Sequence, residues 1–331
     1  MKVIMPVAGK GTRLRPHTHT TAKPLVEVAG KAVLGHILDR LEGLDINELI
    51  FITGKDYEKD IIDYVKKNYS QYKVSYERQK EKLGTAHAIY QAKKHIDEDV
   101  LIVYCDSIIE GDFDIIKKTK ADGIMWAKEV EDPSAYGVLV LDENNYIKKM
   151  VEKPEEFISN LANVGIYYIK NYELLFREIE YIIKKDIKRK GEYYVTSAFQ
   201  RMFEKGEKMI IGKVDKWLDC GNIDSLLETN QYLLSKKNKI EEKGKNCKII
   251  KPVYIEKGAK LENSTIGPFV SIGKGTEIKD SFIENSIIGL ENIISNVRIN
   301  SSVIGSYTKV SGGEFKKLNI GDHSHIEIRF E

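Results

Sequence analysis

The stretch VIMPVAGKGTRLRPHTHTTAKPL, residues 3–25, joins a short apolar run to a loop with two glycines and three basic side chains, and the loop ends in Lys-Pro. The apolar run Val3–Val7 has the composition of a buried strand. Glycine lets backbone N–H groups approach oxyanions closely, while arginine offers a fork of donors and lysine a point charge. This stretch therefore predicts a phosphate-binding loop directly after the first strand of a sheet.

Two well-known glycine loops do not fit this stretch. A P-loop needs a Gly-Lys-Ser or Gly-Lys-Thr ending after four spacer residues, which Gly9 and Gly11 do not provide. A dinucleotide-binding fingerprint would need glycine where Leu14 stands. The loop is therefore expected to hold phosphates in another way.

Strand-like and helix-like patterns alternate over the first hundred residues. Apolar runs typical of strands occupy 49–53, 74–79 and 100–104, and helical periods occupy 32–44, 57–69 and 85–96. This order predicts an α/β fold, with a Rossmann-like, mixed but mostly parallel sheet and helices on both faces. Ligands of such sheets bind at the carboxyl ends of the strands, where loop 8–24, Gln79 and Asp106 are expected.

A repeat dominates the last third of the chain. Ile-Gly recurs every sixteen residues, at 272–273, 288–289, 304–305 and 320–321. Aliphatic residues also recur every six residues, as in Ile255 and Leu261, Ile266, Ile272 and Ile278, Ile288 and Ile294, Ile304 and Val310, and Ile320 and Ile326. This period predicts a left-handed parallel β-helix of hexapeptide repeats, and an irregular all-β tail explains the spacing less well.

The composition suggests three segments and an ordinary globular protein. We predict a first domain over 1–235, a charged linker over 236–247 and a β-helix domain over 248–331.

The net charge of +2 gives no general attraction to nucleic acid, and no apolar run has the length of a membrane span. No signal peptide pattern is seen, and the widely spaced Cys105, Cys220 and Cys247 suit a reducing cytoplasm. We therefore expect a cytoplasmic protein with no nucleic acid or membrane partner.

The loop also resembles the signature of the sugar-1-phosphate nucleotidyltransferases, in AGKGTRLRPHT followed by AKPL. Further segments resemble that family in the same order: ERQKEKLGTAHA (77–88), YCDS (104–107), AYGVL (135–139), VEKP (151–154), NVGIYY (163–168), GEYYVTSA (191–198) and KWLDCG (216–221). The resemblance covers roughly the first 235 residues, and the repeats resemble the tail of longer family members. Within these segments, Cys105 stands where glycine usually precedes the metal aspartate, and Ser197 stands where an aspartate is common.

The resemblance implies a role for each motif. Arg13, Lys23, Asp106 and Lys153 would be catalytic, and Asp106 and Asp219 would hold Mg²⁺. The nucleotide would contact Ala8, Gly9, Gly11, Thr12, Arg13, Gln79, Gly84 and Thr85. The sugar and its phosphate would contact Gly137, Glu152, Lys153, Gly165 and Tyr167. The implied reaction transfers a nucleotidyl group from dTTP or UTP to a sugar 1-phosphate, with glucose 1-phosphate as the default sugar.

Several alternatives remain open at this point. Asp106 and Asp219 could each be the N-cap of a helix, and Tyr167 could serve only for packing. The β-helix could be an acetyltransferase of a bifunctional enzyme, or the whole chain could be a non-catalytic regulatory subunit that senses nucleotide sugars. We expect the β-helix to assemble a homo-oligomer, because exposed coil faces and ends invite packing.

Overall fold

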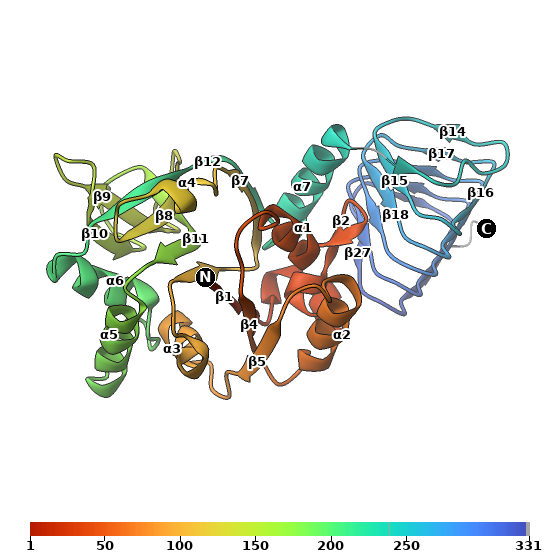
Figure 1. The fold of residues 1–331 in the computed structure, drawn as a ribbon. Helices are drawn as coiled ribbons and strands as arrows, with labels where there is room; N and C mark the ends of the chain where they lie inside the picture. The colour runs from red at the N-terminus through yellow and green to blue at the C-terminus, as the bar shows by residue number, and fades with distance from the viewer. Residues whose placement is uncertain (238, 329–331) are drawn as a thin grey trace. The chain divides into compact units, whose positions relative to one another are not determined.

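The computed structural model describes residues 1–237 and 239–328, and these fall into two units (Figure 1). The first, which we call the sheet unit, comprises Met1–Gly9 and Ile37–Trp217. The second, which we call the β-helix unit, comprises Lys10–His36 and the described residues from Leu218 onward. The loop that opened the sequence analysis therefore leaves the sheet unit after Gly9 and folds with the β-helix.

A ten-stranded mixed sheet organises the sheet unit, in the order β5-β4-β1-β6-β11-β8-β12-β7, with β9 pairing β11 and β10 pairing β9. Its strands are β1 (Lys2–Pro6), β4 (Glu48–Thr53), β5 (Val74–Arg78), β6 (Val100–Val103), β7 (Ser107–Gly111), β8 (Gly123–Glu129), β9 (Gly137–Leu141), β10 (Ile147–Glu152), β11 (Leu161–Ile169) and β12 (Met209–Asp219). The first four strands of this order are parallel, as predicted, and β11 runs antiparallel to β6 and β8. The predicted fold class is confirmed.

Amphipathic helices pack their apolar sides into the core of this unit. The α-helices of the chain are α1 (Val33–Arg40), α2 (Glu58–Asn68), α3 (Thr85–Tyr90), α4 (Ile115–Lys118), α5 (Tyr172–Lys184), α6 (Val195–Glu204) and α7 (Ile223–Lys236). Helix α5 is an example, since it buries Leu175, Ile179 and Ile182 on one side. Its first turn is capped by the Asn171 side chain, which accepts a hydrogen bond from the Leu174 N–H group.

Three parallel sheets form the β-helix, stacked coil upon coil (Figure 1). Their strands are β13 (Lys239–Ile240), β14 (Lys248–Ile249), β15 (Val253–Ile255), β16 (Lys260–Glu262), β17 (Thr265–Ile266), β18 (Val270–Ile272), β19 (Glu277–Lys279), β20 (Phe282–Ile283), β21 (Ile287–Ile288), β22 (Ile293–Ser295), β23 (Arg298–Ile299), β24 (Val303–Ile304), β25 (Lys309–Ser311), β26 (Glu314–Phe315), β27 (Asn319–Ile320) and β28 (His325–Glu327). The aliphatic repeat predicted from the sequence supplies most of the buried core, with Ile272, Ile288 and Ile304 in register in neighbouring coils.

The first coil begins inside the charged stretch predicted to be a linker. Strand β13 pairs with β15, and Ile240 packs against the apolar interior of the β-helix. One inward apolar residue is enough to extend the coil, although the residues around it are charged. The division of the chain at residues 235 and 247 stays a prediction from composition.

A buried amide joins three parts of the β-helix unit. Asn230 of α7 is fully buried, and its Oδ1 accepts hydrogen bonds from the Ala29 N–H group at 3.0 Å and the Ser271 hydroxyl at 2.7 Å. Its Nδ2 donates to the Phe269 carbonyl oxygen at 3.1 Å. Ala29 lies in the turn between β2 (Glu27–Val28) and β3 (Lys31–Ala32), so one side chain links this hairpin, α7 and the β-helix.

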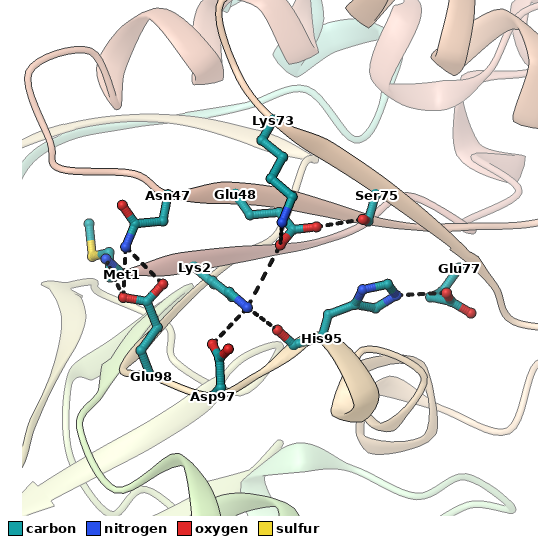
Figure 2. Close-up of polar contacts among 10 residues, drawn as sticks. All are labelled: Met1, Lys2, Asn47, Glu48, Lys73, Ser75, Glu77, His95, Asp97 and Glu98. Atoms are coloured by element: carbon teal, nitrogen blue, oxygen red, sulfur yellow. Dashed lines mark hydrogen bonds and ion pairs between the residues drawn. The ribbon is translucent and has the colours of Figure 1, made fainter.

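Charged side chains are paired at the edge of the sheet where β1, β4 and β5 begin (Figure 2). Glu48 is almost fully buried, and its Oε2 lies 3.1 Å from Lys73 Nζ and 3.7 Å from Lys2 Nζ. Burial would by itself raise the pKa of Glu48. Hydrogen bonds from Ser75 and Lys73 and the charges of Lys73 and Lys2 outweigh burial, and the pKa of Glu48 lies below its ordinary value. The ionised carboxylate therefore stabilises the fold.

We predict that Glu48→Gln lowers the free energy of unfolding by about 2 kcal/mol at pH 7, because the variant leaves the two lysines without their buried partner. The loss should shrink as the pH falls below the ordinary Glu pKa of 4.5, since the wild-type carboxylate then becomes protonated. Urea unfolding between pH 7 and pH 3.5 measures both effects. Glu143→Gln, in the exposed β9–β10 turn, is the control, and an equal loss at both ends of the pH range would contradict the assignment.

Candidate functional site

The phosphate loop of the β-helix unit is built around Gly11. Gly11 has φ 61° and precedes the 3₁₀ turn Thr12–Leu14. A Cβ on it would lie 2.9 Å from Thr18 Cγ2 and 3.0 Å from Lys23 Cβ, and the Thr18 hydroxyl donates to the Gly11 carbonyl oxygen at 2.7 Å. Only glycine fits there without strain, and the tight packing holds the stem of Lys23 against the turn that carries Arg13.

Arg13 and Asp219 flank Gly221 in the same unit. The position that a Cβ on Gly221 would occupy lies 2.9 Å from Arg13 Nη2 and 2.9 Å from Asp219 Oδ1. The Asp219 carboxylate accepts hydrogen bonds from the Gly221 N–H group at 3.0 Å and the Ser225 hydroxyl at 2.8 Å. The structure thus places a predicted phosphate ligand and a predicted metal ligand close to the position that a Cβ on Gly221 would occupy.

Neither predicted metal aspartate is a helix N-cap. Helix α7 is capped by Asn222, whose side chain accepts a hydrogen bond from the Ser225 N–H group. Asp106 follows β6 and leads into another strand, β7, and not into a helix. Among the described residues, no group of three or more histidine, cysteine, aspartate or glutamate side chains is gathered as a metal site.

Ala8 and Gly9 are the predicted nucleotide contacts of the loop that belong to the sheet unit, and they follow the first strand. The Ala8 carbonyl oxygen accepts a hydrogen bond from Lys82 Nζ at 3.0 Å, which ties this strand end to the predicted base-binding segment 77–88. Among the described residues, and apart from its two chain neighbours, no heavy atom lies within 4 Å of a Cβ built on Gly9, so packing does not demand glycine there. A close ligand remains the reason to expect it.

Segments 77–88 and 191–198, which the sequence placed far apart, are held together. A Cβ on Gly84, which has φ 103°, would lie 2.5 Å from the Tyr193 carbonyl oxygen. The Thr85 hydroxyl accepts a hydrogen bond from the Val195 N–H group at 3.0 Å, so it serves the first turn of α6. Gln79 is buried, and its Nε2 donates to the Gly84 carbonyl oxygen at 3.1 Å.

A pocket of about 470 Å³ surrounds the end of β10. Its charged and aromatic lining comes from Glu152, Lys153, Arg189 and Tyr194, together with neighbouring residues. Burial raises the pKa of Glu152, and the charges of Lys153 and Arg189 oppose that rise. Lys153 itself has φ 44°, a left-handed conformation that is costly for a side chain of this kind and typical of functional sites.

The remaining predicted sugar contacts lie around Asn163. A Cβ on Gly137 would lie 2.9 Å from Asn163 Nδ2 and 3.1 Å from Glu152 Oε2, and Asn163 Oδ1 accepts a hydrogen bond from the Gly165 N–H group. Gly165 has φ 81°. Tyr167 is only 1% exposed and packs against Phe199 with ring centroids 4.7 Å apart. It is a core residue in this structure.

Sequence reasoning missed Asn163, Arg189, Tyr194 and Gly221. Asn163 stands inside the quoted segment NVGIYY, and Gly221 inside KWLDCG, so their motifs were the available signal. Arg189 lies in a run of basic residues that looks like an ordinary solvated surface. Its place beside Glu152 depends on folding and had no local signal.

Comparisons with known proteins identify the family of this chain. The family model described as nucleotidyl transferase matches residues 2–236. A glucose-1-phosphate thymidylyltransferase of Streptomyces antibioticus is 31% identical over 365 residues, which cover 99% of this chain and 100% of that protein. The bifunctional protein GlmU of Methanocaldococcus jannaschii is 37% identical over 264 residues, which cover 78% of this chain and 61% of that protein.

A solved structure supports the fold alone. A UDP-glucose pyrophosphorylase complexed with UDP-glucose superposes with a TM-score of 0.62 at 24% identity, over 71% of this chain and 99% of that one. The resemblance read from the motifs is confirmed by the family match and the full-length relative. The chain belongs to the nucleotidyl transferase family.

Proposed function

We propose that this protein transfers a nucleotidyl group from dTTP or UTP to a sugar 1-phosphate, with glucose 1-phosphate as the first sugar to test. The products are a nucleoside-diphosphate sugar and pyrophosphate. The observation that carries the proposal is the similarity to a glucose-1-phosphate thymidylyltransferase over essentially the whole chain. Each unit supplies residues of suitable chemistry, since Arg13 and Lys23 lie in one loop and Glu152 and Lys153 line a polar pocket.

The proposed chemistry depends on charge and positioning. The attacking phosphate oxygen is already ionised, so the reaction needs no general base and no covalent intermediate. The two substrates are both anions, and the barrier falls when cations hold them in line. Arg13 would neutralise the departing phosphates, Lys23 would bind near the reacting phosphate, and Lys153 would hold the phosphate of the sugar.

Asp106 and Asp219 would hold Mg²⁺. Carboxylate oxygens are suitable ligands, and Mg²⁺ usually keeps several waters and binds one or two protein carboxylates together with substrate phosphates. When bound, Mg²⁺ would supply positive charge at the α-phosphate. The hydrogen bonds from Gly221 and Ser225 keep the Asp219 carboxylate oriented.

The hydrogen bonds of Gln79 favour a nucleotide whose pyrimidine base carries a hydrogen-bond donor at N3. Its amide NH₂ group is engaged by the Gly84 carbonyl oxygen and lies 3.2 Å from His87 Nδ1. The amide oxygen would then accept a hydrogen bond from the base, and uracil and thymine carry an N3–H group whereas cytosine does not. This contact does not separate dTTP from UTP.

The relationship to bifunctional proteins favours one second candidate, an additional acetyltransferase activity of the β-helix. This activity is tested by adding acetyl-CoA to the assay described below and measuring the release of free CoA.

The three cysteines are free thiols. This supports a cytoplasmic location, because the cytoplasm is reducing. Among the described residues, no helix is long and apolar enough to cross a membrane.

Incubation with Mg²⁺, each of ATP, CTP, GTP, UTP and dTTP, and a panel of hexose 1-phosphates should release pyrophosphate with dTTP or UTP. Lys23→Ala and Asp106→Asn should each lower turnover about 100-fold or more, because each removes a charge that acts on the phosphates. Lys59→Ala, on the exposed side of α2, is the control. Silence of the folded wild-type protein across the panel, or wild-type rates in either variant, would refute the proposal.

Gly221→Ala should lower kcat/KM about 100-fold, since its Cβ would lie 2.9 Å from both Arg13 Nη2 and Asp219 Oδ1, and these side chains would have to shift. The control is Gly54→Ala, where the nearest atom to the new Cβ lies 3.5 Å away. Circular dichroism and thermal unfolding would show that both variants fold. Unchanged kcat/KM in folded Gly221→Ala would mean that the Arg13 and Asp219 positions do not matter to the reaction.

We also propose that the β-helix assembles a homo-oligomer. Its surface exposes large apolar side chains, among them Ile293 and Tyr307, which are 48% and 53% exposed. Light scattering at micromolar concentration should give a mass that is a multiple of 37.8 kDa. A monomer mass over the whole concentration range would rule out this assembly.

A further inference from the structure

The last coils of the β-helix contact the phosphate loop directly. Asn319 Oδ1 lies 2.5 Å from His17 Nε2, and Asn319 Nδ2 donates to the Arg15 carbonyl oxygen at 3.4 Å. The Thr20 hydroxyl donates to Asp322 Oδ2 at 2.7 Å. Asn319 of β27 and Asp322 of the turn that follows it thus bind the loop, across about three hundred residues of sequence.

The histidine at one of these contacts is buried. His17 is 6% exposed, and burial lowers its pKa, so the neutral ring donates from Nε2 to Asn319 Oδ1. A Cβ on Gly321 would lie 3.1 Å from Pro16 Cβ, so the β-helix backbone approaches the loop closely. Asp322 is itself fixed, because its Oδ1 accepts a hydrogen bond from the Ser306 N–H group of the preceding coil at 2.7 Å.

The anchored residues are connected to the proposed phosphate ligands. Thr18 follows His17 and donates to the Gly11 carbonyl oxygen, and Gly11 packs against the stem of Lys23. Arg13 lies in the 3₁₀ turn that starts after Gly11. A shift of residues 15–20 would therefore move the backbone that carries Arg13 and Lys23.

We propose that Asn319 and Asp322 are positioning residues for the reaction: they hold the phosphate loop in the conformation that presents Arg13 and Lys23 to the nucleotide. The β-helix is then part of the catalytic apparatus and does more than assemble subunits. This inference rests on the proposed function for its kinetic consequence, but the anchoring itself can be measured without substrate.

Hydrogen exchange tests the anchoring independently of activity. In Asn319→Ala, amides of residues 11–23 should exchange about fivefold faster than in the wild-type protein, as expected for one lost hydrogen bond of ordinary strength. Asn300→Ala is the matched control, because Asn300 Nδ2 bonds Glu284 within the β-helix. Exchange in residues 11–23 that does not change in folded Asn319→Ala would overturn the proposal, whatever the enzyme assay shows.

A double-mutant cycle tests the catalytic consequence. Thr20→Val and Asp322→Ala should each lower kcat/KM for the nucleotide about fivefold, and the double variant should lose no more than either single variant. Thr20→Ser, which keeps the hydroxyl, should restore the wild-type value, and KM for the sugar 1-phosphate should stay within twofold. Additive losses would show that the two residues act separately and would refute the positioning role.

The two measurements separate the two proposals. If the wild-type protein releases no pyrophosphate but Asn319→Ala loosens the loop, the proposed function fails and the anchoring stands. If the wild-type protein is active but every β-helix variant keeps its kinetics and its exchange pattern, the proposed function stands and the positioning role fails.

Discussion

The hydrogen bonds of Asn230 decide how the β-helix unit is put together. A buried amide left without partners is costly, so its oxygen and nitrogen require Ala29, Ser271 and Phe269 to keep their places. The hairpin turn at Ala29 and Gly30 is equally constrained, since a Cβ on Gly30 would overlap the Tyr254 ring. These contacts make residues 10–36 part of the β-helix unit and not a loose excursion from the first strand. Arg13 and Lys23 are therefore carried by the same unit as Asp219.

The β-helix can play this part because its coils are stiff in two ways. Aliphatic side chains in register fill the interior, and buried polar side chains bond the backbone of the next coil. Ser286 and Ser302 are examples, since the Ser302 N–H group donates to Ser286 Oγ and the Leu318 N–H group donates to Ser302 Oγ. Asn319 follows directly on this ladder. A side chain carried by such a stiff stack is a good anchor, because little backbone entropy is lost when it binds the loop.

Much of the architecture was predictable because it follows local periodicity. The sixteen-residue Ile-Gly spacing placed Ile272, Ile288 and Ile304 inside the β-helix, and the alternation of strands and helices predicted the parallel part of the sheet. The antiparallel β11 and the bond between His17 and Asn319 depend on residues that are distant in sequence, and no local pattern marks them. The aspartates show the same limit. Asp219 precedes a helix, as an N-cap would, but the cap is Asn222, three residues further on. Asn222 accepts from the Ser225 N–H group, whereas Asp219 accepts from the Ser225 hydroxyl.

The candidate site also shows why motif residues differ in what they do. Gly11, Gly84 and Gly165 have positive φ and close neighbours, so packing alone requires glycine at each of them. Outside its chain neighbours, no described atom lies within 4 Å of a Cβ on Gly9, and the three atoms nearest to a Cβ on Gly221 belong to the Arg13 and Asp219 side chains. Packing against a rigid neighbour does not explain glycine at these two positions, whereas the proposed function would, since phosphate ligands and their charged partners need the space. Glycines of the first kind shape the loop, and glycines of the second kind keep its chemistry accessible, although both look the same in a sequence motif.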